Sequence, residues 1–371
     1  MLNIGFDATA IPSNRVGAGN YIFSLVQSLS KVDIKNNYYI FAKAEHIQEW
    51  RISNPNFHFI TVDISSKALR LLWEQTGLPL AIKRWRIEIL HSPHYTAPII
   101  KPCKSVVTFC DMTFQLIPEK HRPIQRIFFP LMMSWNAQHA DKLIAISEST
   151  RQDAIRLLKI EANKIITIPL AANKNFRVLP NSDIEQICNR YNLKHKKYIY
   201  YVGALEPRKN VPILIEAYAK IAADFIDIPL VIVGKKAWMY DEIFERVSSL
   251  GLQDRVHFLG HIPEPDLIGL YNGSRVFVYP SIYEGFGLPV LEAMQCGTPV
   301  VTTNISSMPE VAGDAAILIA PDDTQGLANA LQQLLLDDNL VNQLSQQGLA
   351  RATKFSWDIC AEETRKVYES L

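Results

Sequence analysis

The feature that most constrains the fold is an alternation of short apolar strands with helical segments, which runs through the chain twice. In the first half, strand-like runs occupy residues 2–7, 38–42, 57–62, 87–91, 104–108, 142–146 and 164–168. Apolar residues at helical spacing lie between several of these runs, as over residues 19–30 and 69–84. Strands that alternate with helices predict a parallel sheet covered by helices.

The pattern loosens over residues 169–180 and then starts again, with strand-like runs at 198–202, 230–234, 256–259, 276–279, 299–302 and 316–319. We therefore predict an α/β protein of two Rossmann-like, doubly wound domains, residues 1–175 and 190–355. In such a protein the two domains face each other across a cleft at the carboxyl ends of both sheets. Residues 356–371 read as a C-terminal helix, with Ser356 as its N-cap, that can pack back on the first domain.

Composition narrows the class of protein. The chain has 371 residues, 48% of them hydrophobic and 20% charged, as in globular proteins of two domains. Its most apolar stretch, residues 127–135, is too short to span a bilayer, and the first residues carry no signal-peptide pattern. The five cysteines are scattered without a CxxC pair, which indicates reduced thiols in a cytoplasm and argues against zinc or a disulfide framework.

The segment 284–292 is the most informative motif, because two glutamates flank a glycine turn that opens a helix. Pro289 suits the first helical turn, and Gly297 suits the position after the last. The free N–H groups near Gly287 and Leu288 can then receive a phosphate. We place Glu284 just before the helix and Glu292 in its first turn, where both carboxylates can accept hydrogen bonds from sugar hydroxyls. The alternative is a solvated turn with two surface acids.

A second motif follows the strand at 198–202, where Arg208 and Lys209 come after a glycine turn and before a helix. Two adjacent cations at the end of a strand can neutralise a diphosphate. A lone Arg-Lys pair is usually an exposed basic loop. Its occurrence on the same predicted sheet edge as the 284–292 motif favours a binding site.

Together these segments resemble the family-four glycosyltransferases, which are retaining enzymes of GT-B architecture. The resemblance covers nearly the whole chain and includes residues 16–21, 140–147, 203–210, 284–292 and 308–316. It implies that Arg208 and Lys209 bind the donor diphosphate, and that Glu284 contacts the sugar and supports positive charge at the anomeric carbon. It further implies roles in donor binding for Glu292 (at the ribose), for the backbone at Gly287 and Leu288, and for Gly17 and Gly19, which let the first loop approach the phosphates.

The first, acceptor-side domain supplies the remaining candidates. Cys110 and Asp111 follow the strand at 104–108, and we place both with Glu284 in the catalytic set. His94 and Asp7 are the acceptor-side candidates, with ordinary loop residues as the alternative reading. Relatives usually carry His-Asp where this chain has Cys110-Asp111, so the role of that histidine is not carried over.

Breaking a sugar–phosphate bond builds charge on phosphate, which preorganised cations and helix ends can stabilise. No two aspartates lie two residues apart, so the Asp-x-Asp metal motif of other transferases is missing. We expect no required metal or cofactor, and a donor that is a nucleotide-diphosphate sugar, with GDP-mannose favoured by the resemblance. A UDP-sugar donor and a non-catalytic, donor-binding relative remain open. A nicotinamide oxidoreductase is disfavoured, because Ile22 stands where the third glycine of its fingerprint belongs.

Charge is divided unevenly along the chain, with 21 Lys and Arg against 13 Asp and Glu in residues 1–175 and 17 against 24 in the remainder. Basic residues mix with large apolar ones over residues 67–86 and 120–135, among them Lys120 and Arg122. Such segments can rest on anionic lipid, or they can be ordinary core helices. We expect a cytoplasmic enzyme, peripheral on the inner face of the membrane, that acts on a glycan or polyprenyl-linked glycan in surface-polysaccharide assembly and binds no nucleic acid.

Overall fold

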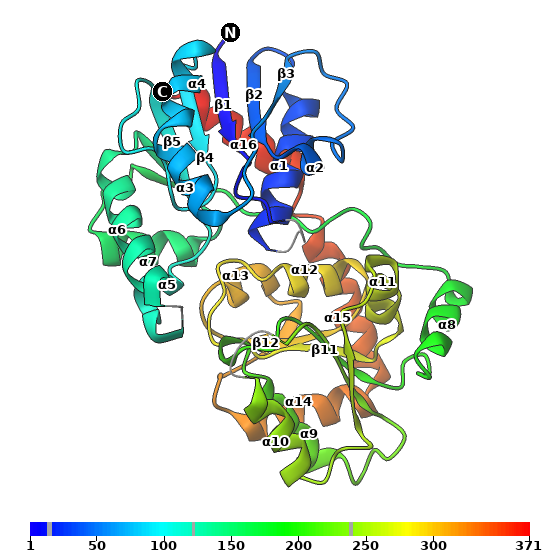
Figure 1. Ribbon diagram of the computed structural model, residues 1–371. Helices are drawn as coiled ribbons and strands as arrows, with labels where there is room; N and C mark the ends of the chain where they lie inside the picture. The colour runs from blue at the N-terminus through cyan, green and yellow to red at the C-terminus, as the bar shows by residue number, and fades with distance from the viewer. Residues whose placement is uncertain (13–16, 121–122, 237–239) are drawn as a thin grey trace. The chain divides into compact units, whose positions relative to one another are not determined.

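The computed structural model describes residues 1–12, 17–120, 123–236 and 240–371. The chain divides into two compact units, Met1–Ala171 with Ser356–Leu371, and Ala172–Phe355. The division falls inside the loosened segment 169–180. Each unit contains one parallel sheet wrapped by helices (Figure 1). The predicted pair of doubly wound α/β sheets is therefore confirmed.

The first unit is built on a seven-stranded sheet with the order β3-β2-β1-β4-β5-β6-β7. Its strands are β1 (Asn3–Asp7), β2 (Asn37–Ala42), β3 (Phe57–Thr61), β4 (Ile89–Ser92), β5 (Lys104–Phe109), β6 (Lys142–Ala145) and β7 (Ile165–Thr167). Its helices are α1 (Ala18–Val32), α2 (Ala44–Ile47), α3 (Lys67–Gln75), α4 (Gly77–Arg84), α5 (Thr113–Leu116), the 3₁₀ turn Pro118–Lys120, α6 (Pro123–His139), α7 (Glu148–Leu158) and α16 (Trp357–Glu369). The order reverses between β1 and β4, which is the topological switch point of this sheet.

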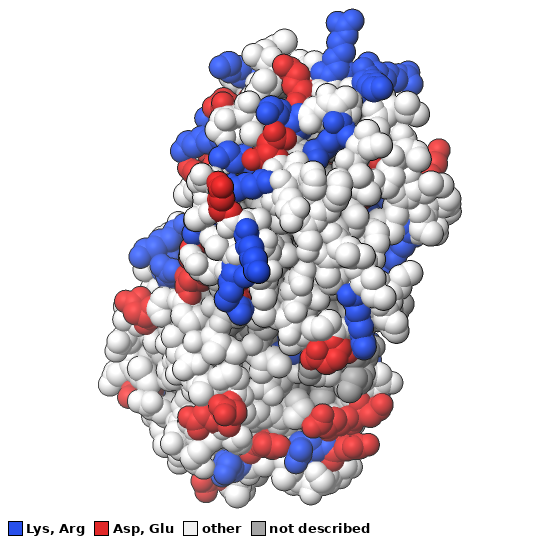
Figure 2. Space-filling model, turned by 90° about the vertical axis from the view of Figure 1, so that its left-hand side faces the viewer, with Lys and Arg blue, Asp and Glu red and all other residues white. Residues whose placement is uncertain are grey.

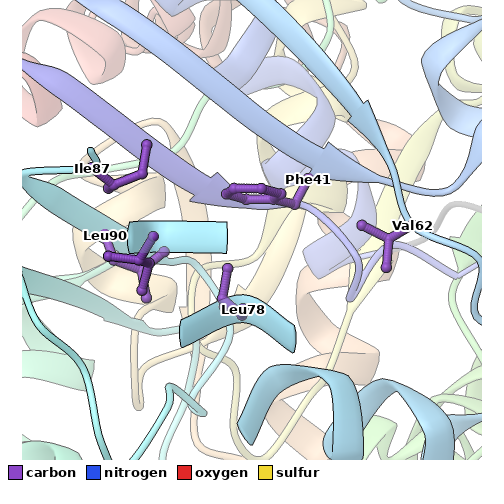
Figure 3. Packing of buried hydrophobic residues seen from close by; sticks show 6 residues of the cluster. Phe41, Val62, Leu78, Ile87 and Leu90 are labelled. Atoms are coloured by element: carbon purple, nitrogen blue, oxygen red, sulfur yellow. The ribbon is translucent and has the colours of Figure 1, made fainter. Parts of the chain in front are cut away.

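One face of this sheet is sealed by apolar side chains from β2, β4 and α4. Phe41, Leu78 and Leu90 are fully buried, with Val62, Ile82 and Ile87 packed around them (Figure 3). A strand that is covered on both faces reads as a continuous apolar run, which explains why the sequence shows these strands so clearly.

The segment 69–84, expected as one helical stretch, forms two helices that meet at Thr76. Pro79 has no N–H to donate to the carbonyl of Gln75, so an uninterrupted helix would lose a backbone bond there. Gly77 allows the close approach, because a Cβ atom at this position would lie 2.5 Å from the ring of Trp73. The break leaves α3 free to lie at a different angle from α4.

The C-terminal helix α16 belongs to the first unit and lies beside α1 (Figure 1). Ser356 caps it, as predicted, by accepting a bond from the N–H of Asp358. A buried polar chain holds the helix to the sheet: the Tyr368 hydroxyl lies 2.6 Å from Nδ1 of His91, and Nε2 of His91 lies 2.8 Å from the Thr108 hydroxyl. Burial lowers the pKa of His91 to about 3, so this imidazole is neutral at physiological pH.

The second unit has a six-stranded sheet with the order β10-β9-β8-β11-β12-β13. Its strands are β8 (Ile199–Val202), β9 (Leu230–Val233), β10 (Val256–Gly260), β11 (Val276–Tyr279), β12 (Val300–Thr303) and β13 (Ala316–Ile319). Its helices are α8 (Asn181–Arg190), the 3₁₀ turn Pro207–Lys209, α9 (Val211–Ile221), α10 (Asp241–Ser249), α11 (Glu264–Gly273), α12 (Leu288–Gln295), α13 (Met308–Ala312), α14 (Thr324–Leu336) and α15 (Asp338–Ala352). The switch point lies between the paired strands β8 and β11.

Candidate active site

The two sequence motifs of the second unit meet at the switch point of its sheet. The loop after β8 carries Arg208 and Lys209, and the loop after the neighbouring β11 carries Glu284. Ligands of open α/β sheets bind outside the carboxyl ends of the strands at such a point. The topology therefore places these three side chains where a ligand is expected.

Glu284 is the centre of a buried cluster and is only 8% exposed. Its Oε2 lies 2.8 Å from Nη1 of Arg208, and its Oε1 lies 2.6 Å from Nζ of Lys209. Two hydroxyls also donate to Oε1, those of Ser281 at 2.6 Å and Tyr279 at 3.0 Å. Lys209 donates as well to the Tyr279 hydroxyl at 2.5 Å, so lysine, tyrosine and glutamate form a closed triangle.

The electrostatics keep this carboxylate charged. Burial alone would raise the pKa of Glu284, but the charges of Arg208 and Lys209 and the hydrogen bonds to Oε1 outweigh it and lower the pKa to about 2. Arg208 is held in turn by Glu206, 2.7 Å from its Nη2, and by the carbonyl of Tyr283, to which Nη1 donates at 2.8 Å. The cluster is thus a preformed set of opposite charges.

The helix α12 begins where the motif predicts, with Pro289 in its first turn and Gly297 in the left-handed region after its end. Gly287 is the N-cap, with a φ of 105°, and a Cβ atom there would lie 2.3 Å from the Met308 methyl group. Only glycine satisfies both conditions. Ser307 holds the approach to the helix by donating to the carbonyls of residues 284 and 286.

Glu292 corrects one detail of the sequence interpretation. The sequence predicted Glu292 in the first turn of the helix. Because the helix starts at Leu288, Glu292 is instead its fifth residue and lies just beyond that turn. The Tyr271 hydroxyl donates to its Oε2 at 3.2 Å. Burial raises the pKa of Glu292 to about 7, and the hydrogen bond from Tyr271 only partly offsets this. The two glutamates of the motif therefore occupy opposite electrostatic environments.

The two glycines of the first loop differ in their surroundings. Gly17 is the N-cap of α1 with a φ of 50°, which favours glycine, and among the described residues a Cβ atom there would meet nothing within 4 Å. A Cβ atom at Gly19 would lie 2.9 Å from Cδ of Pro12, which makes this glycine a packing requirement. Val16, the first residue of the motif, lies outside the described residues.

The first unit brings its own candidates to the carboxyl ends of β1, β4 and β5. Asp7 is the buried last residue of β1, and its Oδ1 accepts bonds from the backbone and hydroxyl of Thr9. Asp111 closes a turn by accepting from the backbone and hydroxyl of Thr113. Burial and the charge of Arg70 lower the pKa of His94 to about 4, so the imidazole is neutral.

Cys110 is partly buried, and its Sγ lies 3.7 Å from the carbonyl of Pro93. Burial and the neighbouring Asp111 raise the pKa of this thiol well above its usual range. A thiol in that state is a small, weakly polar group and a poor nucleophile.

Sequence reasoning missed Tyr279 and Ser281, whose hydroxyls bind Glu284. Tyr279 appeared only as the last residue of an apolar strand, and its position beside Lys209 follows from the pairing of β8 with β11. Within the described ranges, no group of three or more His, Cys, Asp or Glu side chains is arranged to hold a metal ion.

Comparison with known proteins identifies the class to which this fold and site belong. Residues 16–175 match the family model described as Glycosyltransferase Family 4, and residues 183–351 match Glycosyl transferases group 1. The chain is 34% identical over 294 residues to O-antigen chain mannosyltransferase B of Escherichia coli, covering 78% of this chain and 76% of that protein. The chain therefore belongs to this family of glycosyltransferases, and the predicted resemblance and transferase class are confirmed.

Other relatives agree with the assignment. The serotype-specific mannosyltransferase WbdA of Escherichia coli is 33% identical over 277 residues, which are 72% of this chain but only 34% of that longer protein. Among solved structures, Anabaena HepE in complex with UDP and glucose covers both chains fully with a TM-score of 0.79 at 19% identity. WaaG, a glycosyltransferase involved in lipopolysaccharide biosynthesis, gives a TM-score of 0.75 at 16% identity over 98% of this chain and 99% of that one. These two likenesses show the shared GT-B fold.

Proposed function

We propose that the protein is a retaining glycosyltransferase that moves mannose from GDP-mannose to a glycan or lipid-linked glycan in the assembly of a surface polysaccharide. The observation that carries the proposal is the buried cluster of Glu284, Arg208 and Lys209 at the switch point of the second sheet. The mannosyltransferase names of the relatives at 33–34% identity support mannose and an O-antigen type of product.

In this proposal the cluster works on the bond between the sugar and the diphosphate. As that bond breaks, negative charge builds on the leaving phosphate, and Arg208, Lys209 and the N-terminus of α12 stabilise it. Positive charge builds at the anomeric carbon, and the ionised Glu284 stabilises it. The acceptor oxygen forms the new bond on the face that the phosphate leaves, and its proton passes to a phosphate oxygen.

The ion pairs of Glu284 add a condition to this scheme. The carboxylate of Glu284 forms charged hydrogen bonds with both cations, 2.6 Å to Lys209 and 2.8 Å to Arg208. A diphosphate that binds Arg208 and Lys209 must share them with this carboxylate. Donor binding therefore weakens the pairing of Glu284 and makes its charge available to the sugar.

The donor is tested by thermal shift and by calorimetry on the purified protein with a panel of nucleotide sugars. A ligand present at 100 times its Kd should stabilise the protein by about 2.7 kcal/mol. We expect GDP-mannose and GDP to give the largest shift, and a response to UDP-sugars alone would contradict the choice of base. The UDP donor remains the second candidate, because HepE, which shares the fold, was solved with UDP and with UDP-glucose.

We further propose that no metal is required, because Arg208 and Lys209 supply the cationic charge that other transferases take from a metal. Turnover in EDTA should then equal turnover in magnesium. The alternative that Cys110 leaves open is that this protein is a non-catalytic relative. In that case it would bind GDP-mannose without releasing GDP from it.

We propose that the first unit rests on an anionic membrane. The helix α6 carries an apolar stripe at helical spacing, with Ile124, Ile127, Leu131 and Trp135 exposed by 77, 66, 65 and 37%. These side chains are not core residues, in contrast to one reading of the sequence. Figure 2 shows Lys and Arg side chains, with Asp and Glu side chains among them, beside a broad surface without charge. Arg122 of the predicted basic set lies outside the described residues.

An exposed apolar stripe of this kind, on a helix that also carries the exposed Arg126, fits a lipid surface. Among the described residues, no helix is long and apolar enough to cross a membrane. Sedimentation with vesicles of phosphatidylglycerol should carry the protein down, and Ile127→Asp with Leu131→Asp should abolish this. Equal binding of that variant would contradict the assignment of the surface.

A further inference from the structure

The first unit contains an ion cluster that the proposed function does not use. Arg70 of α3 lies between two carboxylates, with Nη1 2.9 Å from Oε2 of Glu74 and 3.8 Å from Oδ2 of Asp7. Its Nη2 donates to the Thr96 hydroxyl at 3.2 Å, and that hydroxyl donates to Glu74 at 2.6 Å. Glu74, Asp7 and Thr96 are all buried, with exposures of 0–2%.

The position of the cluster in the fold is informative. Asp7 is the last residue of β1, and Thr96 follows the end of β4, so Arg70 reaches the carboxyl ends of the two strands between which the sheet order reverses. In the second unit the corresponding point, between β8 and β11, holds Arg208, Lys209 and Glu284. The same rule that locates the donor site therefore locates a ligand site at Arg70.

Two observations separate this cluster from an ordinary structural ion pair. The buried partners of Arg70 fix its orientation, yet its side chain keeps 14% of its surface exposed. A guanidinium carries five N–H donors in a planar fork, more than the bonds to Glu74 and Thr96 require. The charge of Arg70 also contributes, after burial, to the lowered pKa of His94, a predicted acceptor-side residue.

The charge of the cluster selects the chemistry of the ligand. One guanidinium faces two carboxylates, Asp7 and Glu74, so its positive charge is already compensated. A phosphate at this point would meet net negative charge, whereas a neutral hydroxyl would receive an N–H bond without electrostatic cost. The ligand class that fits is a polyol. If the proposed function holds, on which this step rests, the polyol is the sugar that accepts the transferred residue.

We propose that Arg70, oriented by Glu74, Asp7 and Thr96 at the switch point of the first sheet, binds the hydroxyls of a neutral carbohydrate acceptor and sets acceptor specificity. Glu74 is a positioning residue, because its carboxylate is fully buried and acts through Arg70.

The test uses the full-length protein with GDP-mannose as donor and methyl α-mannoside as acceptor, and it follows transfer and donor hydrolysis separately. Arg70→Lys keeps the charge but loses the fork, so KM for the mannoside should rise about 10- to 100-fold, the scale of one charged hydrogen bond. KM for GDP-mannose and the rate of its hydrolysis without acceptor should stay unchanged. Arg51→Lys, which replaces an exposed arginine of the same unit, is the matched control and should change none of these three quantities.

A purely structural role would lower transfer and donor hydrolysis together, or would leave the acceptor KM unchanged, and either result would overturn the proposal. Glu74→Gln should raise the acceptor KM in the same direction as Arg70→Lys. A preference for mannose 6-phosphate over the neutral mannoside, lost in Arg70→Lys, would show an anion site and overturn the assignment of a polyol. A wild-type protein that neither hydrolyses nor transfers from GDP-mannose would refute the proposed function and this inference with it.

Discussion

At the scale of the residue, Glu284 shows what a sequence can and cannot predict. The motif around residues 284–292 identified the residue and the glycine turn before its helix. The side chains that bind its carboxylate, Arg208, Lys209, Ser281 and Tyr279, come from two different loops and a strand end. Spacing along the chain does not encode such contacts, because they depend on which strands are neighbours in the sheet.

Glu284→Gln should reduce kcat by about a hundredfold or more, because the charge acts on a cationic anomeric centre that exists only in the transition state. The affinity for GDP should stay the same or increase, since the variant removes the anion that competes for Arg208 and Lys209. Stopped assays for kcat and calorimetry for GDP measure the two effects. A kcat within a factor of about three of wild type would show that the assignment is wrong.

Cys110 stands where the resemblance to the family led us to expect a histidine. Its Sγ lies 3.7 Å from the carbonyl of Pro93, which is a weak contact, so Cys110→Ala and Cys110→Ser should change kcat/KM by less than about a factor of five. Asp111→Ala serves as the comparison and should cost more, if its carboxylate orients sugar or acceptor. A thousandfold loss in both cysteine variants would demonstrate a specific chemical role for the thiol.

At the scale of the element, glycine and proline indicated both ends of α12 but did not lead us to expect the break between α3 and α4. Pro289 and Gly297 bracket α12 as expected. Glu292 was expected in the first turn but is the fifth residue of the helix, because the motif does not fix the first helical residue to within one position. The break at Thr76 was missed because apolar residues continue at helical spacing on both sides of it, although Gly77 and Pro79 lie just after it.

The free energy of unfolding should depend on pH through the buried carboxyl of Glu292 on α12. In the folded protein this carboxyl holds its proton up to a pKa of about 7, whereas in the unfolded chain it loses it near 4.5. Between these values the native state binds more protons, so wild-type stability falls as pH rises, and the loss is complete above about pH 7. Glu292→Gln cannot ionise, so its free energy of unfolding should exceed that of wild type at pH 8 but not at pH 4. Denaturant titrations of both proteins at pH 4 and pH 8 measure this difference. An equal difference in the free energy of unfolding at the two pH values would contradict the raised pKa.

The helix α16 should depend on the bond between Tyr368 and His91. Tyr368→Phe leaves Nδ1 of a buried, neutral histidine without this partner, so the free energy of unfolding should fall by about 1–3 kcal/mol. Tyr39→Phe, at a half-buried position on β2, is the matched control and should have a smaller effect. Equal midpoints for both variants in urea would show that the bond does not anchor the helix.

At the scale of the whole molecule, the two sheets were predictable because parallel strands buried on both faces leave long apolar runs in the sequence. The order of the strands in each sheet was not predictable. Because the switch points follow from that order, the residues that lie at them were not predictable either. The sequence drew attention to Arg208 and Lys209 but not to Arg70 and Glu74, which stand in a basic, apolar segment without a motif. Whether α6 was core or surface was also undecided, since an amphipathic period does not say which face meets a partner.

The central claim is that this chain transfers mannose from GDP-mannose with retention, through the cluster at Glu284. The most direct measurement is proton NMR of the reaction of GDP-mannose with a mannose-terminated acceptor. The account predicts an α-linked product that grows in step with GDP and that forms about a hundredfold more slowly, or slower still, with Glu284→Gln. A β-linked product, or GDP-mannose that is bound but never consumed, would contradict it.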